Sequence, residues 1–168
     1  MKSIEEKRKE LQKFEKSLEG KTLAELEKLE QEIIAEADKN GEELGKVEFD
    51  MPEDNYETVA KAVRMFLNKQ SVQWQYTLGM VAMYDFWDPT KRPAKIPYPH
   101  LDSILRTLGG LQFTGYEEWA AVVAVNKFFE PLQKAYVEAT DTTYEIATRH
   151  DTVVRAIEKA TPIENKEK

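Results

Sequence analysis

Four short motifs of a kind that begins α-helices recur along this chain. Each pairs a Ser, Thr or Asp with a Glu three residues later, at Ser3–Glu6, Thr22–Glu25, Asp54–Glu57 and Thr114–Glu117. In such a capping box, the first side chain accepts a hydrogen bond from the first helical turn, and the Glu carboxylate accepts one from the capping residue's backbone. Apolar residues at helical spacing follow each motif, so we predict an all-α fold.

The first two motifs open an N-terminal helical hairpin, which we predict over residues 1–41. Its first helix covers about residues 4–19 and ends where Gly20 adopts a left-handed conformation. Its second helix covers about residues 23–39 and ends at Asn40–Gly41. A short helix with a narrow apolar face is only marginally stable alone, so the hairpin needs a partner surface. The first-helix residues predicted to contact that surface are Leu11, Phe14 and Leu18.

Residues 42–53 are predicted to form an ordered, extended linker. Apolar and acidic residues alternate near its end, as in a β-strand, but no partner strand is visible in the sequence. We assign residues 54–162 to a helical core module and residues 163–168 to a charged tail.

The first part of the core module is clearly helical from Asn55 to Leu67, because apolar residues recur there every three or four positions. The pattern over residues 72–87 fits two structures. Apolar and polar residues alternate at its start, as in a strand, yet apolar residues also fall on one helical face. We predict a helix, with a strand as the alternative.

Residues 88–99 hold four of the seven prolines, which excludes a regular helix or a central strand. Pro99 suits the start of a short helix over about residues 100–108, which Gly109–Gly110 ends. The last motif opens a further helix, and Pro131 either kinks that helix or begins another. The predicted core side of this helix consists of Trp119, Val122, Val123, Phe128 and Phe129.

The most regular pattern is a heptad seam near the C-terminus, which predicts a long helix. Its members are Leu132, Tyr136, Ala139, Thr143, Ile146, His150, Val153 and Ile157. The seam packs either inside the same chain or against a second chain, and the sequence leaves both open. We select Tyr136, Thr143 and His150 as candidate contact residues. If His150 is buried in the seam, its protonation should lower the stability in mild acid.

A second candidate contact region is the segment 84–99, in which aromatic residues bracket a proline-rich loop with three cations. Its candidate residues are Trp87, Lys91, Arg92, Lys95 and Tyr98. One interpretation is a hydrophobic core covered by a rigid loop. The other is a docking surface, since prolines pre-organise the backbone and Trp, Tyr and Arg are favoured interface anchors.

Composition excludes several classes of function. With two histidines and no cysteine, the chain shows no metal-binding, nucleotide-binding or nucleophile motif, so we assign no catalytic, cofactor or metal residue. A net charge of −7 argues against nucleic-acid binding. The longest apolar stretch is far short of the ~20 residues that span a bilayer, and no apolar run follows the charged N-terminus. We therefore expect a cytoplasmic protein, or one inside a particle assembled there.

These observations favour a non-catalytic helical structural or assembly protein that binds itself or a larger protein assembly and forms oligomers. In general character the chain resembles small assembly proteins of phages and viruses, a resemblance that assigns no residues. One alternative is a monomeric binding module or regulator that uses the loop 84–99. A second alternative is an enzyme built from carboxylates without a recognisable motif.

Overall fold

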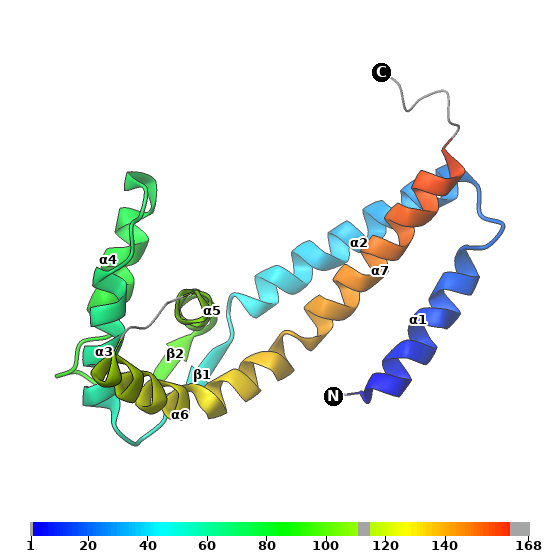
Figure 1. Cartoon of the computed structure of the whole chain (residues 1–168). Helices are drawn as coiled ribbons and strands as arrows, with labels where there is room; N and C mark the ends of the chain where they lie inside the picture. The colour runs from blue at the N-terminus through cyan, green and yellow to red at the C-terminus, as the bar shows by residue number, and fades with distance from the viewer. Residues whose placement is uncertain (1, 111–114, 162–168) are drawn as a thin grey trace. The chain divides into compact units, whose positions relative to one another are not determined.

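The computed structural model describes residues 2–110 and 115–161. Within these ranges the chain is mostly helical, with seven α-helices, one 3-10 helix and one two-stranded sheet, which confirms the all-α prediction (Figure 1). The elements are α1 (Ile4–Leu18), α2 (Leu23–Leu44), β1 (Glu48–Asp50), α3 (Tyr56–Asn68), η1 (Trp74–Tyr76), α4 (Thr77–Phe86), β2 (Lys95–Pro97), α5 (Tyr98–Gly109), α6 (Tyr116–Ala139) and α7 (Asp141–Ala160). None of the helices in the described ranges has the length and apolar character needed to cross a membrane.

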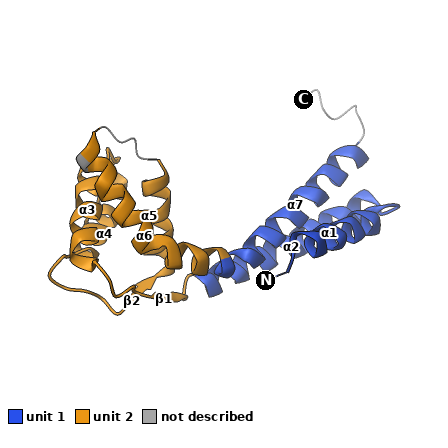
Figure 2. Ribbon diagram, turned by 60° about the horizontal axis from the view of Figure 1, so that its bottom comes forward, with its two compact units in different colours: residues 1–44, 138–168 blue, residues 45–137 orange. Residues whose placement is uncertain are grey.

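The structure contains two compact units (Figure 2). Unit 1 consists of residues 1–44 and 138–168, and unit 2 consists of residues 45–137. Unit 1 thus contains α1, α2 and α7, whereas unit 2 contains both strands, α3, η1, α4, α5 and most of α6. The sequence suggested a different grouping, with the C-terminal helix in the module 54–162. The difference arises because α7 packs on α2.

The helix starts confirm two of the four predicted capping boxes. The backbone N–H of Ser3 donates to the Glu6 carboxylate at 2.7 Å, which lowers the pKa of that carboxyl, and Ser3 Oγ accepts from the Glu6 backbone. Thr22 and Glu25 form the same arrangement. The box predicted at Asp54 is wrong, because Asn55 occupies the helix start in a left-handed conformation with a φ of 59°. The box at Thr114 lies outside the described residues.

The first helix ends as predicted, with Gly20 at a φ of 78°. The predicted end of the second helix is wrong, since α2 continues through Asn40 and Gly41 to Leu44. The Asn40 side chain donates a hydrogen bond to the Thr143 hydroxyl of α7 at 2.7 Å, and Leu44 is buried. Gly inside a helix costs only about 1 kcal/mol, which these tertiary contacts can exceed.

The core of unit 1 joins all three of its helices. Leu18 of α1, Leu26 and Ile33 of α2, and Ile146 and Val153 of α7 form one buried cluster. The buried members of the heptad seam on α7 therefore face α2 of the same chain. The seam is also divided between two helices, because α6 ends at Ala139 and α7 begins at Asp141.

The strand pattern predicted in the linker is real and has a partner. β1 pairs antiparallel with β2, and the buried residues Phe49 and Ile96 lie opposite each other. The sheet has only these two strands among the described residues, so both are edge strands and the missing N–H of Pro97 interrupts no sheet interior.

The core of unit 2 is built around Trp87, whose side chain is 0% exposed. Its ring stacks on Tyr56 and meets Phe86, Phe128 and Phe129, with ring centroids 5.5–6.4 Å apart. Phe128 and Phe129 are buried as predicted, whereas the core position predicted for Trp119 is wrong, because this residue is 58% exposed. Pro131 lies within α6, which continues past it.

Candidate functional site

The loop residues selected from the sequence mostly make contacts within unit 2. Trp87 is in the core, and Arg92 donates to the Met51 carbonyl at 2.9 Å. Lys91 and Lys95 are exposed beside acidic residues, with N–O distances of 3.9 and 3.7 Å to Asp88 and Asp50. The loop is thereby fixed, and its two exposed lysines are partly neutralised.

The two candidate tyrosines stack on each other. The rings of Tyr98 and Tyr136 are nearly parallel at 3°, with centroids 5.6 Å apart. The Tyr136 hydroxyl donates to the Asp102 carboxylate at 2.6 Å, and Asp102 also accepts from Arg106. Burial and the hydrogen bond to Asp102 raise the pKa of Tyr136 far above its usual range. These contacts join α5 to α6.

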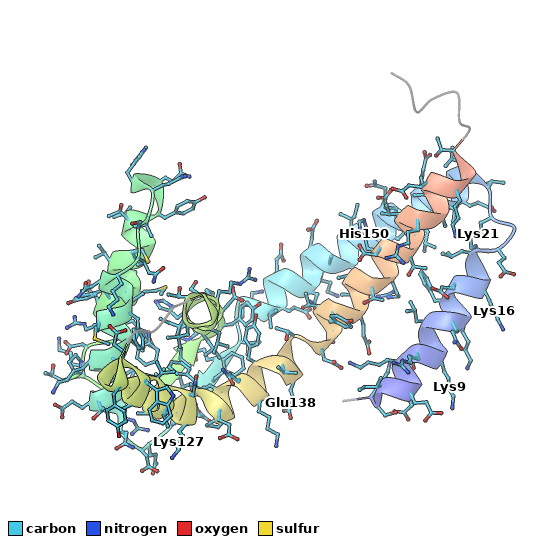
Figure 3. All side chains as sticks on the ribbon, viewed as in Figure 1. Lys9, Lys16, Lys21, Lys127, Glu138 and His150 are labelled. Atoms are coloured by element: carbon cyan, nitrogen blue, oxygen red, sulfur yellow. The ribbon has the colours of Figure 1, made fainter. Side chains whose placement is uncertain are left out.

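The two polar seam residues bridge α7 to α2. Thr143 accepts from Asn40, and His150 Nε2 lies 3.4 Å from the Glu30 carboxylate, on the α2 side of α7 in Figure 3. The His150 side chain is 35% exposed, so His150 is not buried in the seam. The condition on which the predicted acid sensitivity depended is therefore not met.

The first-helix candidates line or adjoin a groove between α1 and α7. Leu18 is buried in the unit 1 core, and the half-buried Leu11 and Phe14 line the groove together with the exposed residues Ile4 and Tyr144. An ion pair between Lys7 and Asp141 joins the two helices beside it. The groove is a second possible contact surface.

Unit 2 exposes an apolar surface that was not selected from the sequence. We call it the η1–α4 patch, and its members are Val72, Trp74, Tyr76, Leu78 and Val81. Trp74 is 87% exposed and Leu78 is 84% exposed. Such side chains are normally covered when they lie together, because large contiguous apolar patches are rare on soluble monomers and are often functional.

The C-terminal half of α4 is anchored to α3 and to the core of unit 2. Arg64 of α3 donates to the Tyr84 carbonyl at 3.0 Å, and its guanidinium lies 4.0 Å from the centre of the Tyr84 ring. Met83 is buried and Trp87 follows in the core. The N-terminal half of α4 instead exposes the apolar side chains of Leu78 and Val81, so no packing within the described part of the chain explains its composition.

The patch is free of charge. Residues 70–84 form a run of fifteen residues without a Lys, Arg, Asp or Glu. Two further exposed aromatic residues, Tyr116 and Trp119, form a ring pair at the start of α6 with centroids 5.9 Å apart. An ion pair between Lys69, which lies just before the patch in sequence, and Glu118 joins the start of α6 to the end of α3. An apolar surface therefore gathers at one end of unit 2.

His100 is the titratable residue whose burial predicts a pH effect near neutrality. Its ring lies against Phe86 with centroids 4.7 Å apart, and burial lowers the pKa of its imidazole below the usual value of about 6.5. The folded state therefore favours neutral His100, and the unfolded chain binds a proton more readily. The contribution of His100 to the free energy of unfolding is therefore fully present above about pH 6.5 and is lost as the pH falls below it.

We accordingly expect the urea midpoint of unit 2 to be lower at pH 5.5 than at pH 7.5, and the difference to shrink in His100→Gln. Tryptophan fluorescence measures this transition selectively, because Trp74, Trp87 and Trp119 all lie in unit 2. His150→Gln in unit 1 is the matched control and should leave the pH difference unchanged. An equal pH difference in His100→Gln and the natural chain would contradict the assignment.

The described ranges contain no group of three or more His, Asp or Glu side chains that could hold a metal ion. Comparison of the chain with known protein families, with curated proteins and with solved structures finds no match. The candidate site therefore rests on the geometry alone.

Proposed function

We propose that this chain is a non-catalytic helical assembly protein and that the η1–α4 patch is its main docking surface. The observation that carries the proposal is the exposure of Trp74 on η1 and of Leu78 on α4, a helix whose sequence is apolar apart from Thr77 and Asp85. A helix of this composition is normally buried, so its exposure indicates that another protein covers it. The aromatic residues suit this role, because Trp and Tyr are the side chains most enriched at binding hot spots.

The anchoring of α4 supports the same function. Contacts from Arg64, together with the buried Met83, fix one half of the helix, so the exposed half is presented by a rigid base. A pre-ordered surface binds with a smaller loss of conformational entropy than a disordered one. The chain then acts as a scaffold in which unit 2 presents a docking helix.

Site-specific photo-crosslinking tests the proposal. Leu78 is replaced by benzoylphenylalanine in cells that naturally contain the protein, and Lys16 is replaced in the same way as the control. Both positions are exposed, and Lys16 lies on the side of α1 away from α7 (Figure 3). We expect a discrete protein adduct from position 78 and none from position 16. Absence of any adduct at position 78 would refute the proposed docking function.

A further inference from the structure

We infer that the η1–α4 patch binds the same patch of a second copy of this chain, as an antiparallel pair of α4 helices. This inference rests on the proposed function and names the partner. Charge is the first argument. The chain has a net charge of −7, so two copies repel unless neutral surfaces meet. Residues 70–84 provide such a surface, because none of them is charged.

The helix direction follows from the charged residue that ends this neutral run. Leu78, Val81 and Asp85 are spaced three and four residues apart and are all exposed, so they share the outer face of α4. A parallel pair would place Asp85 against its own copy. An antiparallel pair centred near residue 80 instead places each Asp85 beside the N-terminal end of the partner helix, where the helix dipole favours a negative charge.

The exposed surface is also large enough for two copies. At about 200 Å² for each aromatic side chain, Trp74 and Tyr76 of the patch expose on the order of 300 Å², and the Tyr116–Trp119 pair of α6 exposes a similar area. With the aliphatic members of the patch, the total approaches the roughly 800 Å² that each partner contributes to a standard interface. Open space surrounds Gly79, so a second helix can come close to the middle of α4.

The charges near the patch favour a second copy of this chain over a lipid bilayer as its partner. Lys69, the cation nearest to the patch in sequence, is paired with Glu118, and the whole chain is acidic. Attraction to anionic lipid requires basic residues beside the apolar ones. Two acidic copies that meet through neutral residues need no such basic residues. The second copy is therefore the occupant that the charges support best.

Sedimentation equilibrium of the full chain tests the pairing. We expect the molar mass to rise from 19.5 kDa towards twice that value over micromolar concentrations, and Leu78→Glu to weaken association roughly a hundredfold. Ala147→Glu is the control, because Ala147 is exposed but lies on α7 of unit 1, outside the α1–α7 groove. Both replaced residues are exposed, so circular dichroism should show unchanged folding. A natural chain that stays monomeric, or variants that dissociate equally, would overturn the pairing.

Single cysteines test the helix direction, since the chain has none of its own. Val81→Cys should form a disulfide-linked dimer under mild oxidation, whereas Asp85→Cys should not. Efficient crosslinking of both variants would show a parallel pair and overturn the antiparallel one. A monomer that floats with phosphatidylcholine vesicles would also overturn self-pairing. So would a photo-crosslink from position 78 to a protein of another mass, but this crosslink would leave the proposed docking function intact.

Discussion

Replacement of Trp87 by Ala is expected to lower the free energy of unfolding of unit 2 by about 3–5 kcal/mol, the usual cost of truncating a fully buried Trp. The side chain is 0% exposed, and its ring contacts Tyr56 from α3 and both Phe128 and Phe129 from α6. The variant therefore leaves a cavity at the point where these helices meet. Because small proteins are stable by only about 5–15 kcal/mol, this loss is a large fraction of the total. Urea unfolding followed by circular dichroism measures it.

Two further variants show whether the loss comes from core packing. Trp74→Ala removes the same side chain from a position that is 87% exposed, and the change in stability should stay within about 0.5 kcal/mol. Trp87→Phe keeps an aromatic ring in the core and removes the buried Nε1, which finds no hydrogen-bond partner within the described residues. It should cost much less than Trp87→Ala. Equal effects of Trp87→Ala and Trp74→Ala would contradict the core position of Trp87.

This contrast between two tryptophans bears on how binding data should be interpreted. The sequence interpretation that used loop 84–99 as a docking surface relied on Trp87 as an anchor. With Trp87 buried, a loss of binding in Trp87→Ala would reflect the damaged fold of unit 2. Substitutions at Trp74 or Leu78 remove exposed surface instead, so they separate binding from folding.

Local signals in the sequence predicted the helix class and several helix ends correctly. The capping boxes at Ser3 and Thr22 and the left-handed Gly20 depend on residues within one helical turn, so the sequence contains their whole explanation. The wrong end at Gly41 has a different origin. α2 continues because Asn40 contacts Thr143, a residue more than a hundred positions away. Pairing of β1 with β2 was missed for the same reason.

The η1–α4 patch was missed because burial does not follow from residue type. Trp119 and Trp87 are both tryptophans in helical patterns, yet one is 58% exposed and the other 0% exposed. One sequence signal could have indicated the patch. The run 70–84 has no charged residue, and its apolar residues are not confined to one helical face, unlike those of an ordinary amphipathic surface helix. A helix of this kind is usually buried, and the sequence alone does not show that α4 is exposed in its own chain.

Replacement of Val153 by Asp is expected to unfold unit 1 and leave unit 2 folded. Val153 is 0% exposed in a cluster that has five buried residues within the described ranges, among them Leu26 and Ile33 of α2. An unpaired carboxylate in this position costs roughly 3–5 kcal/mol, and so thin a core has little stability to lose. Helical circular dichroism should fall by the share of α1, α2 and α7. Tryptophan fluorescence should keep its folded spectrum, because all three tryptophans lie in unit 2.

The control for this variant is Ala147→Asp, which introduces the same charge at an exposed position of α7. Its cost should be near the difference in helix propensity, about 0.7 kcal/mol, with both optical signals unchanged. If Val153→Asp keeps its full helicity, the α2–α7 core is not what holds unit 1 together. If the fluorescence transition is lost together with the helicity, the two cores do not fold separately. A loss of unit 1 alone would mean that unit 2 folds without α1, α2 and α7, so that the proposed docking by unit 2 can be tested on it separately.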